Sequence, residues 1–111
     1  MNIEELRNYC LSLPDTFDCF PFDEDAMVFK VRLTNGSEKM FGLISLSKPD
    51  FIALKCDPEW ALELRERHPE ITPAYHFNKK HWNGVRVDGV LSRSLICELI
   101  DHSYKLVRGR K

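Results

Sequence analysis

Residues 26–46 read AMVFKVRLTNGSEKMFGLISL and carry the clearest β-strand signal of the chain. Met27, Phe29 and Val31 alternate with residues that would point to the other side of a strand, and residues 39–46 are again rich in apolar side chains. Between the two runs lies Thr34-Asn35-Gly36-Ser37, whose central Asn-Gly pair is typical of a tight hairpin turn. The stretch therefore predicts two antiparallel strands joined by a turn.

The sequence on either side extends this hairpin. Lys48-Pro49-Asp50 predicts a second turn, and residues 51–56 form a short apolar run that predicts a third strand. A three-stranded antiparallel meander is the simplest arrangement of these runs. Upstream, residues 15–25 mix three phenylalanines with Pro21 and five acidic residues, which predicts an irregular or short edge segment.

Helices are predicted at both ends of the chain and in its middle. Three capping signals mark their starts: Asn2 with Glu5 for residues 3–13, Asp57 with Pro58 for residues 58–68, and Ser92 for a final helix that runs through Val107. Each of these segments has apolar residues at the spacing of one helix face. Pro14 and Pro69 end the first two helices.

Two further strands, at residues 71–77 and 85–88, complete the predicted order α-β-β-β-α-β-β-α. With 111 residues, of which 43% are hydrophobic, the chain suits one domain over residues 1–111 with a single core. The predicted fold class is α+β, a two-layer sandwich in which helices cover one face of an antiparallel sheet.

The charges are distributed unevenly along the chain. Residues 1–75 carry eight Lys or Arg against fourteen Asp or Glu, whereas residues 76–111 carry eight against three. The formal net charge of -1 argues against a generally basic nucleic-acid-binding protein. The basic C-terminal third nevertheless indicates a local surface for an anionic partner.

The four cysteines and the apolar runs bear on location and redox state. Cys10, Cys19, Cys56 and Cys97 are far apart and form no CxxC pair, so we expect reduced thiols, at least three of them buried, and a cytoplasmic protein. The apolar runs are too short for a membrane span, and the N-terminus does not read as a signal peptide. No membrane association is therefore expected.

Residues 75–83, YHFNKKHWN, hold the densest cluster of functional residue types. Lysine ammonium groups and asparagine amides contact phosphates, and aromatic rings stack on exposed bases. The alternative is that Tyr75, Phe77 and Trp82 fill the core and that the lysines lie in a solvated turn. We expect Trp82 to be at least partly buried and to pack against the C-terminal helix.

The end of the last helix adds Lys105, Arg108, Arg110 and Lys111. Cations at a helix C-terminus also complement the helix dipole without any ligand. These residues therefore indicate binding only if they lie beside Lys79 and Lys80 in the folded domain.

No catalytic, metal or cofactor site is predicted. His76 and His81 have no carboxylate or thiol at a metal-ligand spacing, and the chain has no GxSxG elbow, GxGxxG loop or P-loop. An enzyme is therefore not expected.

The chain resembles the MmcQ/YjbR family along its full length. The resemblance is carried by Pro73, by Asn78-Lys79-Lys80-His81-Trp82-Asn83, by Asp88-Gly89, and by Leu99-Ile100-Asp101 with Ser103-Tyr104 and Leu106-Val107. It implies a secretion-chaperone-like α+β fold and a DNA-binding role with a double-wing motif. It also marks Asn78, Trp82, Asp88, Gly89 and Tyr104 as a structural signature.

Three hypotheses of function follow. The first is binding of nucleic acid, DNA above all, through phosphate contacts on one positive surface made by Lys79, Lys80, His81, Arg86, Lys105, Arg108 and Arg110. The second is a protein-interaction or chaperone-like module that presents an apolar sheet face or strand edge to a partner. The third is a small-molecule site around the histidines.

Overall fold

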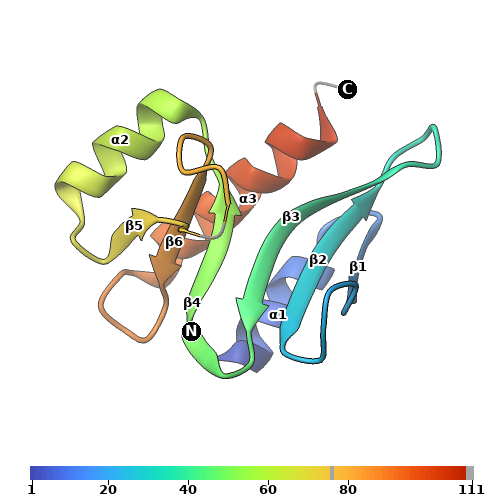
Figure 1. Ribbon diagram of the computed structural model, residues 1–111, viewed down its shortest axis with the longest axis horizontal. Helices are drawn as coiled ribbons and strands as arrows, with labels where there is room; N and C mark the ends of the chain where they lie inside the picture. The colour runs from blue at the N-terminus through green and yellow to red at the C-terminus, as the bar shows by residue number, and fades with distance from the viewer. Residues whose placement is uncertain (76, 110–111) are drawn as a thin grey trace.

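The computed structural model describes residues 1–75 and 77–109, which form three helices and a six-stranded antiparallel sheet. The first and third helices lie on one face of the sheet, and the second lies at one end of it (Figure 1). The elements are α1 (Ile3–Leu11), β1 (Thr16–Cys19), β2 (Ala26–Arg32), β3 (Glu38–Ser45), β4 (Lys48–Lys55), α2 (Pro58–Arg67), β5 (Ile71–Pro73), β6 (Trp82–Arg86) and α3 (Arg93–Arg108). The strands lie in the order β1-β2-β3-β4-β6-β5. The predicted α+β class, with helices on one face, is confirmed.

The hairpin predicted from residues 26–46 is formed by β2 and β3. Gly36 has a φ of 88°, a left-handed conformation that favours glycine, and the side chain of Asn35 accepts a hydrogen bond from the Ser37 N–H. Phe29 pairs with Gly42 and Lys30 with Met40, so Phe41 is an extra residue that forms a β-bulge. Its ring is completely buried under α3.

The segment predicted as irregular or a short edge contains β1, so four strands rather than three precede α2. β1 pairs with β2 from Thr16 opposite Val31 to Cys19 opposite Val28. All four of its residues are half-buried, because an edge strand has a neighbour on one side alone. The edge alternative is confirmed, but without an alternation of buried and exposed positions the sequence pattern did not distinguish a strand from an irregular segment.

Three predicted boundaries differ from the structure by three residues or more. Lys48-Pro49-Asp50 begins β4 instead of forming a turn. The turn between β3 and β4 lies at residues 46–47, and hydrogen bonds from Ser47 to the Asp25 carboxylate hold it. β5 ends at Pro73 rather than at residue 77, and β6 begins at Trp82 rather than at residue 85. Asn and Gly are poor strand formers, so the start of β6 depends on tertiary contacts described below.

The C-terminal helix is the main cover of the sheet. Its buried stripe consists of Ile96, Leu99, Ile100, Ser103, Tyr104 and Val107. The Ser103 hydroxyl donates to the Phe41 carbonyl at 2.6 Å and accepts from the Lys55 N–H at 2.9 Å. One buried hydroxyl therefore fixes α3 to both β3 and β4.

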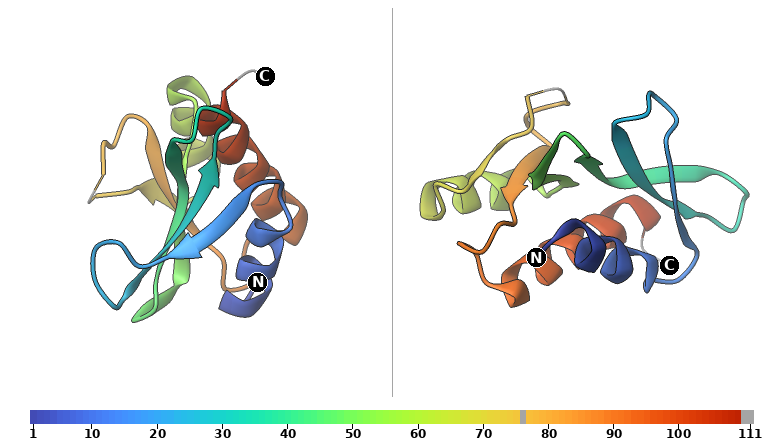
Figure 2. Two further views of the ribbon diagram at one scale, coloured as in Figure 1. Left: turned by 90° about the vertical axis from the view of Figure 1, so that its right-hand side faces the viewer. Right: turned by 90° about the horizontal axis from the view of Figure 1, so that it is seen from below.

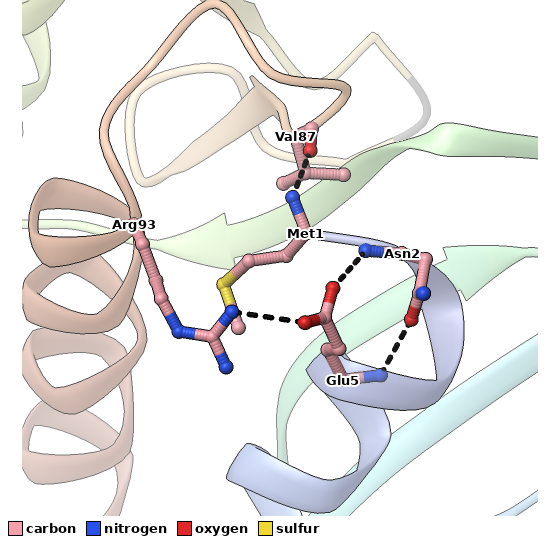
Figure 3. A network of polar contacts seen from close by, with 5 residues as sticks. All are labelled: Met1, Asn2, Glu5, Val87 and Arg93. Carbon is pink, nitrogen blue, oxygen red and sulfur yellow. Dashed lines mark hydrogen bonds and ion pairs between the residues drawn. The ribbon is translucent and has the colours of Figure 1, made fainter.

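A polar network joins the start of α1 to the start of α3 and the segment after β6 (Figure 3). Asn2 and Glu5 form the predicted capping box, each side chain accepting from the other's backbone N–H. Glu5 also pairs with Arg93 at 3.0 Å, and the Met1 amine donates to the Val87 carbonyl at 2.6 Å. These contacts hold α1 and α3 on the same side of the sheet.

The thiols differ from the prediction in their burial. Cys10 and Cys56 are buried, whereas Cys19 and Cys97 are half-buried, and all four are free. Burial raises the pKa of Cys10 to about 12 and that of Cys56 to about 11, which disfavours the reactive thiolate. At least three buried thiols were expected, but the edge position of β1 leaves Cys19 partly accessible.

Candidate binding site on the open face of the sheet

The sheet has one face that the helices do not cover. In Figure 2, the loop between β1 and β2 and the loop between β5 and β6 both project from the side opposite α1 and α3. Because side chains alternate along a strand, Asn83 and Val85 point toward the helices, whereas Trp82, Gly84 and Arg86 point away from them. We call the uncovered side the open face.

A groove of about 440 Å³ lies on the open face beside the β5–β6 loop. It is lined by Leu43, Ser45, Ser47, Lys48, Phe51, Ala53, Ala74, Tyr75, Phe77 and Gly84. Ala53 and Gly84 are direct cross-strand neighbours on β4 and β6. The Ala53 methyl group and the bare backbone of Gly84 form the floor, and the larger side chains of Phe51, Tyr75 and Phe77 also line the groove.

Aromatic rings and cations meet at the β5–β6 side of the groove. Phe77 stacks on Trp82 with ring centroids 5.0 Å apart and an interplanar angle of 24°. Tyr75, on the same loop, is 67% exposed to solvent. Lys79 Nζ lies 5.1 Å from the centre of the Tyr75 ring. Lys55 is the direct cross-strand neighbour of Trp82.

The partial burial predicted for Trp82 is confirmed, but its predicted packing against the C-terminal helix is wrong. The indole lies on the open face against Phe77, because β6 begins at Trp82 and strand alternation turns this residue away from α3. It therefore fixes the β5–β6 loop to the sheet rather than the sheet to a helix.

Arg65 on α2 anchors the β5–β6 loop from the helical side. Its Nε donates to Asn83 Oδ1 at 2.7 Å, and its Nη2 donates to the carbonyls of Lys79 and Trp82. Asn83 is 1% exposed, so this buried amide needs a partner. Sequence reasoning missed Arg65, because only the fold brings this helix residue to a loop that lies 14 positions away in the chain.

The predicted cations fall into two groups on opposite sides of the sheet. Lys79 and Lys80 are exposed on the β5–β6 loop, and His81 is half-buried beside them. Lys105 and Arg108 lie on α3, and Arg108 sits 5.6 Å from the centre of the Tyr104 ring. The fold therefore does not place them on one surface, while Arg110 lies outside the described residues.

Arg86 has a partner of its own. Its guanidinium donates two hydrogen bonds to the Asp88 carboxylate, at 2.8 and 2.9 Å. These hydrogen bonds lower the pKa of Asp88, so the carboxylate stays ionised beside the guanidinium. Arg86 is thus less available to an anion than an unpaired cation would be.

The residues marked as a structural signature make contacts that hold the fold. Asn78 accepts a hydrogen bond from the Lys80 N–H with its side chain and from the Trp82 N–H with its carbonyl, which closes the loop before β6. Gly89 has a φ of 111° in the turn after Asp88. The Tyr104 hydroxyl donates to the Pro14 carbonyl at 2.6 Å and ties α3 to the segment between α1 and β1.

The described residues contain no cluster of three or more His, Cys, Asp or Glu side chains that could hold a metal ion. Among residues 1–75 and 77–109, none of the helices combines the length and hydropathy that a membrane crossing needs.

Comparison with known proteins relates the chain to one family. The model of the YjbR family matches residues 11–106. YbdF of Escherichia coli O157:H7 is 38% identical over 105 residues, which cover 94% of this chain and 82% of YbdF. YjbR of Escherichia coli K12 is 34% identical over 106 residues, which cover 95% of this chain and 86% of YjbR. Both relatives are described as uncharacterized.

Solved structures share the fold. The crystal structure of a Deinococcus radiodurans protein with a DUF419 domain matches with a TM-score of 0.88 and 42% identity over 96% of this chain and 78% of that one. A Pseudomonas syringae crystal structure matches with a TM-score of 0.79 and 32% identity, over 97% of this chain and 100% of that one. The arrangement of helices and strands is therefore one that occurs in proteins of similar sequence.

Proposed function

The chain belongs to the YjbR family, as its resemblance in sequence predicted, and we propose that it binds single-stranded nucleic acid, DNA in the first instance, on its open face. The observation that carries the proposal is the meeting of aromatic rings and lysines around one groove. The proposed role is binding without catalysis.

Single strands suit this surface better than duplexes do. The faces of the bases are accessible in a single strand, and proteins that bind single strands commonly stack them on aromatic side chains over a basic groove. Tyr75 offers an exposed ring at the rim, and the Phe77–Trp82 pair adds a second aromatic surface. An open antiparallel sheet backed by helices provides a rigid support for such contacts.

Three lysines supply the phosphate contacts in this proposal. Lys48 lines the groove, and Lys79 and Lys80 lie on the loop beside it. Among the described residues, none of the three forms an ion pair, so their charges remain available to phosphates. Lys105 and Arg108, on the far side of the sheet, contribute to the field of the molecule but not to this contact surface.

Acidic residues limit the length of the bound strand. The loop between β1 and β2 carries Asp23, Glu24 and Asp25 and projects from the same side of the sheet as the lysine-bearing loop (Figure 2). Asp23 and Asp25 accept hydrogen bonds from the backbone N–H groups of Ala26 and Ser47, which hold the two carboxylates in place on this loop. We expect the strand to run over β4, β6 and β5 and to avoid the β1–β2 end.

Binding of a protein segment is the second candidate, and exposed apolar side chains favour it. Phe22, on the β1–β2 loop, is 67% exposed, and Phe20 and Leu46 near it are also exposed. The lining of the groove is mostly apolar, which suits an extended peptide as well as a base. This candidate predicts binding that depends little on salt.

The proposal predicts a salt dependence that titration of a fluorescent twelve-nucleotide DNA strand can measure. If three phosphates are neutralised, log K should fall with log salt at a slope of about -2, since each contact contributes about -0.7 for single strands. Replacing Lys79→Ala and Lys80→Ala together should make the slope shallower by about 1.4, because two contacts are lost.

A matched control is the double variant Lys39→Ala, Lys105→Ala, which removes two exposed lysines away from the groove. Its slope should stay close to that of the unmodified protein. Equal losses in both double variants, or no salt-sensitive binding to single strands at about 50 mM salt, would contradict the proposal. Binding to a duplex alone would also contradict it.

A further inference from the structure

We infer that the groove holds one unpaired nucleobase, lying flat on the floor that Ala53 and Gly84 form. This inference rests on the proposed function and deepens it, because it assigns a separate subsite for a base next to the lysines that contact phosphate. Three observations support it: the shape of the floor, the presence of glycine inside a strand, and the rings around the groove.

The floor is one cross-strand pair of small residues, with pairs of larger residues on either side along the strands. Ala53 pairs with Gly84, and the pairs on either side along the open face are Phe51 with Arg86 and Lys55 with Trp82. Residues 51 and 55 are four positions apart on β4, so their Cα atoms are about 13 Å apart. The groove volume of about 440 Å³ lies in the lower part of the range for small-ligand sites and suits a flat ring system.

Gly84 is the residue whose presence most needs explanation. Glycine inside a strand costs stability, and it commonly marks a bulge or the close approach of a ligand or another backbone. The pairing of β6 with β4 and β5 is regular through Gly84, so no bulge accounts for it. A Cβ placed there would lie 3.5 Å from Thr72 Oγ1 and 3.8 Å from the Thr72 carbonyl oxygen, which is ordinary contact.

Gly42 is an example of a strand glycine that is explained by packing in the core. A Cβ at Gly42 would face the side chains of Leu54, Phe29 and Ile52 at 3.5 to 3.6 Å, so three core residues surround that glycine. At Gly84, the near atoms belong to Thr72 alone, on the neighbouring strand β5, and no core side chain surrounds the position, which also lines the groove. The missing side chain at Gly84 therefore keeps room for something outside the chain.

The surroundings of this space suit a nucleobase. Phe51, Tyr75 and Phe77 provide flat apolar contacts, and the Ser45 hydroxyl, which also belongs to the lining, provides a polar group. Lys79 and Lys80 lie on the same loop as Tyr75, so a phosphate beside the base would face them. A base inside a duplex is stacked on both faces, and therefore only an unpaired base can reach the floor.

The experiment uses two variants and two short strands. Gly84→Leu fills the space above the floor, and Tyr75→Ala removes a wall; Tyr75 is largely exposed, so its loss should not unfold the chain. One probe is a DNA hexamer with a single 2-aminopurine among abasic sugars, and the other is the same hexamer without any base. Thermal unfolding checks that each variant is folded.

The unmodified protein should bind the 2-aminopurine hexamer more tightly than the abasic one and change its fluorescence. Gly84→Leu and Tyr75→Ala should each weaken binding of the 2-aminopurine hexamer roughly five- to a hundredfold, because stacking of one base is lost. Each should weaken binding of the abasic hexamer much less, so that the difference between the two hexamers disappears. The double variant Lys79→Ala, Lys80→Ala should weaken binding of both hexamers.

The outcomes separate the two proposals. One outcome would refute the base subsite alone: the lysine variant weakens binding, but the two hexamers bind equally well and neither Gly84→Leu nor Tyr75→Ala changes their affinity. Nucleic-acid binding on the open face would then still stand. If the unmodified protein binds neither hexamer nor longer single strands, the proposed function itself fails. If Gly84→Leu does not fold, Tyr75→Ala with the two hexamers decides the question.

Discussion

Ser103 is a single residue that joins the helical layer to the sheet. Its completely buried hydroxyl bonds both the extra carbonyl of the β3 bulge and the last N–H of β4. A β-bulge leaves backbone groups without ladder partners, and a buried polar group without a partner is costly. A small polar residue in an otherwise apolar helix stripe is thus explained by the sheet that it faces.

Ser103→Ala should lower the free energy of unfolding by about 2 to 4 kcal/mol, since it leaves a buried carbonyl and a buried N–H without their partner. Urea unfolding, with an unchanged m value, is the measurement. Ser94→Ala, on an exposed position of the same helix, is the control and should change stability by less than about 0.5 kcal/mol. Similar losses in the two variants would show that Ser103 does not have this role.

His102 couples stability to pH. Its Nε2 accepts a hydrogen bond from the Asp57 N–H at 3.1 Å, and its ring lies edge-on to Trp60 with centroids 4.6 Å apart. Partial burial lowers the pKa of His102 in the folded state below its ordinary value of 6.5. The unfolded chain therefore binds a proton more readily than the folded chain does.

The contribution of His102 should be complete above about pH 6.5 and be lost as the pH falls through the lowered pKa of the folded state. Urea unfolding between pH 7.5 and 5 should thus show a decrease in stability on acidification. His102→Gln should flatten this decrease, whereas His81→Gln should leave it in place. An equally steep decrease in His102→Gln would assign the pH dependence to other groups.

At the scale of the element, the β5–β6 loop owes its position to a neighbouring helix. Arg65 donates to the buried Oδ1 of Asn83 and also binds two loop carbonyls. The Nδ2 of Asn83 has no hydrogen-bond partner among the described residues. The planar guanidinium can make these bonds together, which a lysine ammonium cannot reproduce. The geometry of the groove wall thus depends on a side chain that does not line the groove.

Arg65→Lys should free the loop without removing the charge. We expect a loss of about 1 to 3 kcal/mol in the free energy of unfolding, because a buried amide oxygen loses its charged partner. Amide hydrogen exchange at residues 78–82 should become faster, while exchange in β2 and β3 stays slow. Arg67→Lys is the control. Arg67 is exposed and lies two residues after Arg65 on α2, so this substitution should change neither quantity.

The sequence pattern predicted elements with strong local signals and missed those that depend on their neighbours. The capped helices and the Asn35-Gly36 hairpin are specified by local sequence features, namely capping residues, apolar periodicity and turn residues. β1 has no alternation because it is an edge, and the start of β6 contains Asn83 and Gly84, which are stabilised by contacts from other elements. Local propensity cannot reveal such contacts.

At the scale of the whole molecule, the topology decides which charges act together. The cluster around Lys79 and Lys80 was predicted from composition, and it does border a groove. The separation of Lys105 and Arg108 from it could not be predicted, because both segments are basic whichever side of the sheet each occupies. The groove was also hidden from sequence reasoning, since its lining comes from β3, β4, β6 and two connecting segments.

The strand order has a consequence for how the molecules behave beside one another. The two outermost strands, β1 and β5, are the shortest of the sheet, with four and three residues, and β5 ends in a proline. A long, flat outer strand would offer unpaired backbone groups to a strand of another molecule and allow sheets to fuse into aggregates. Such short outer strands present few unpaired backbone groups to a strand of another molecule. The chain can therefore leave an aromatic sheet face uncovered while its borders discourage fibre formation.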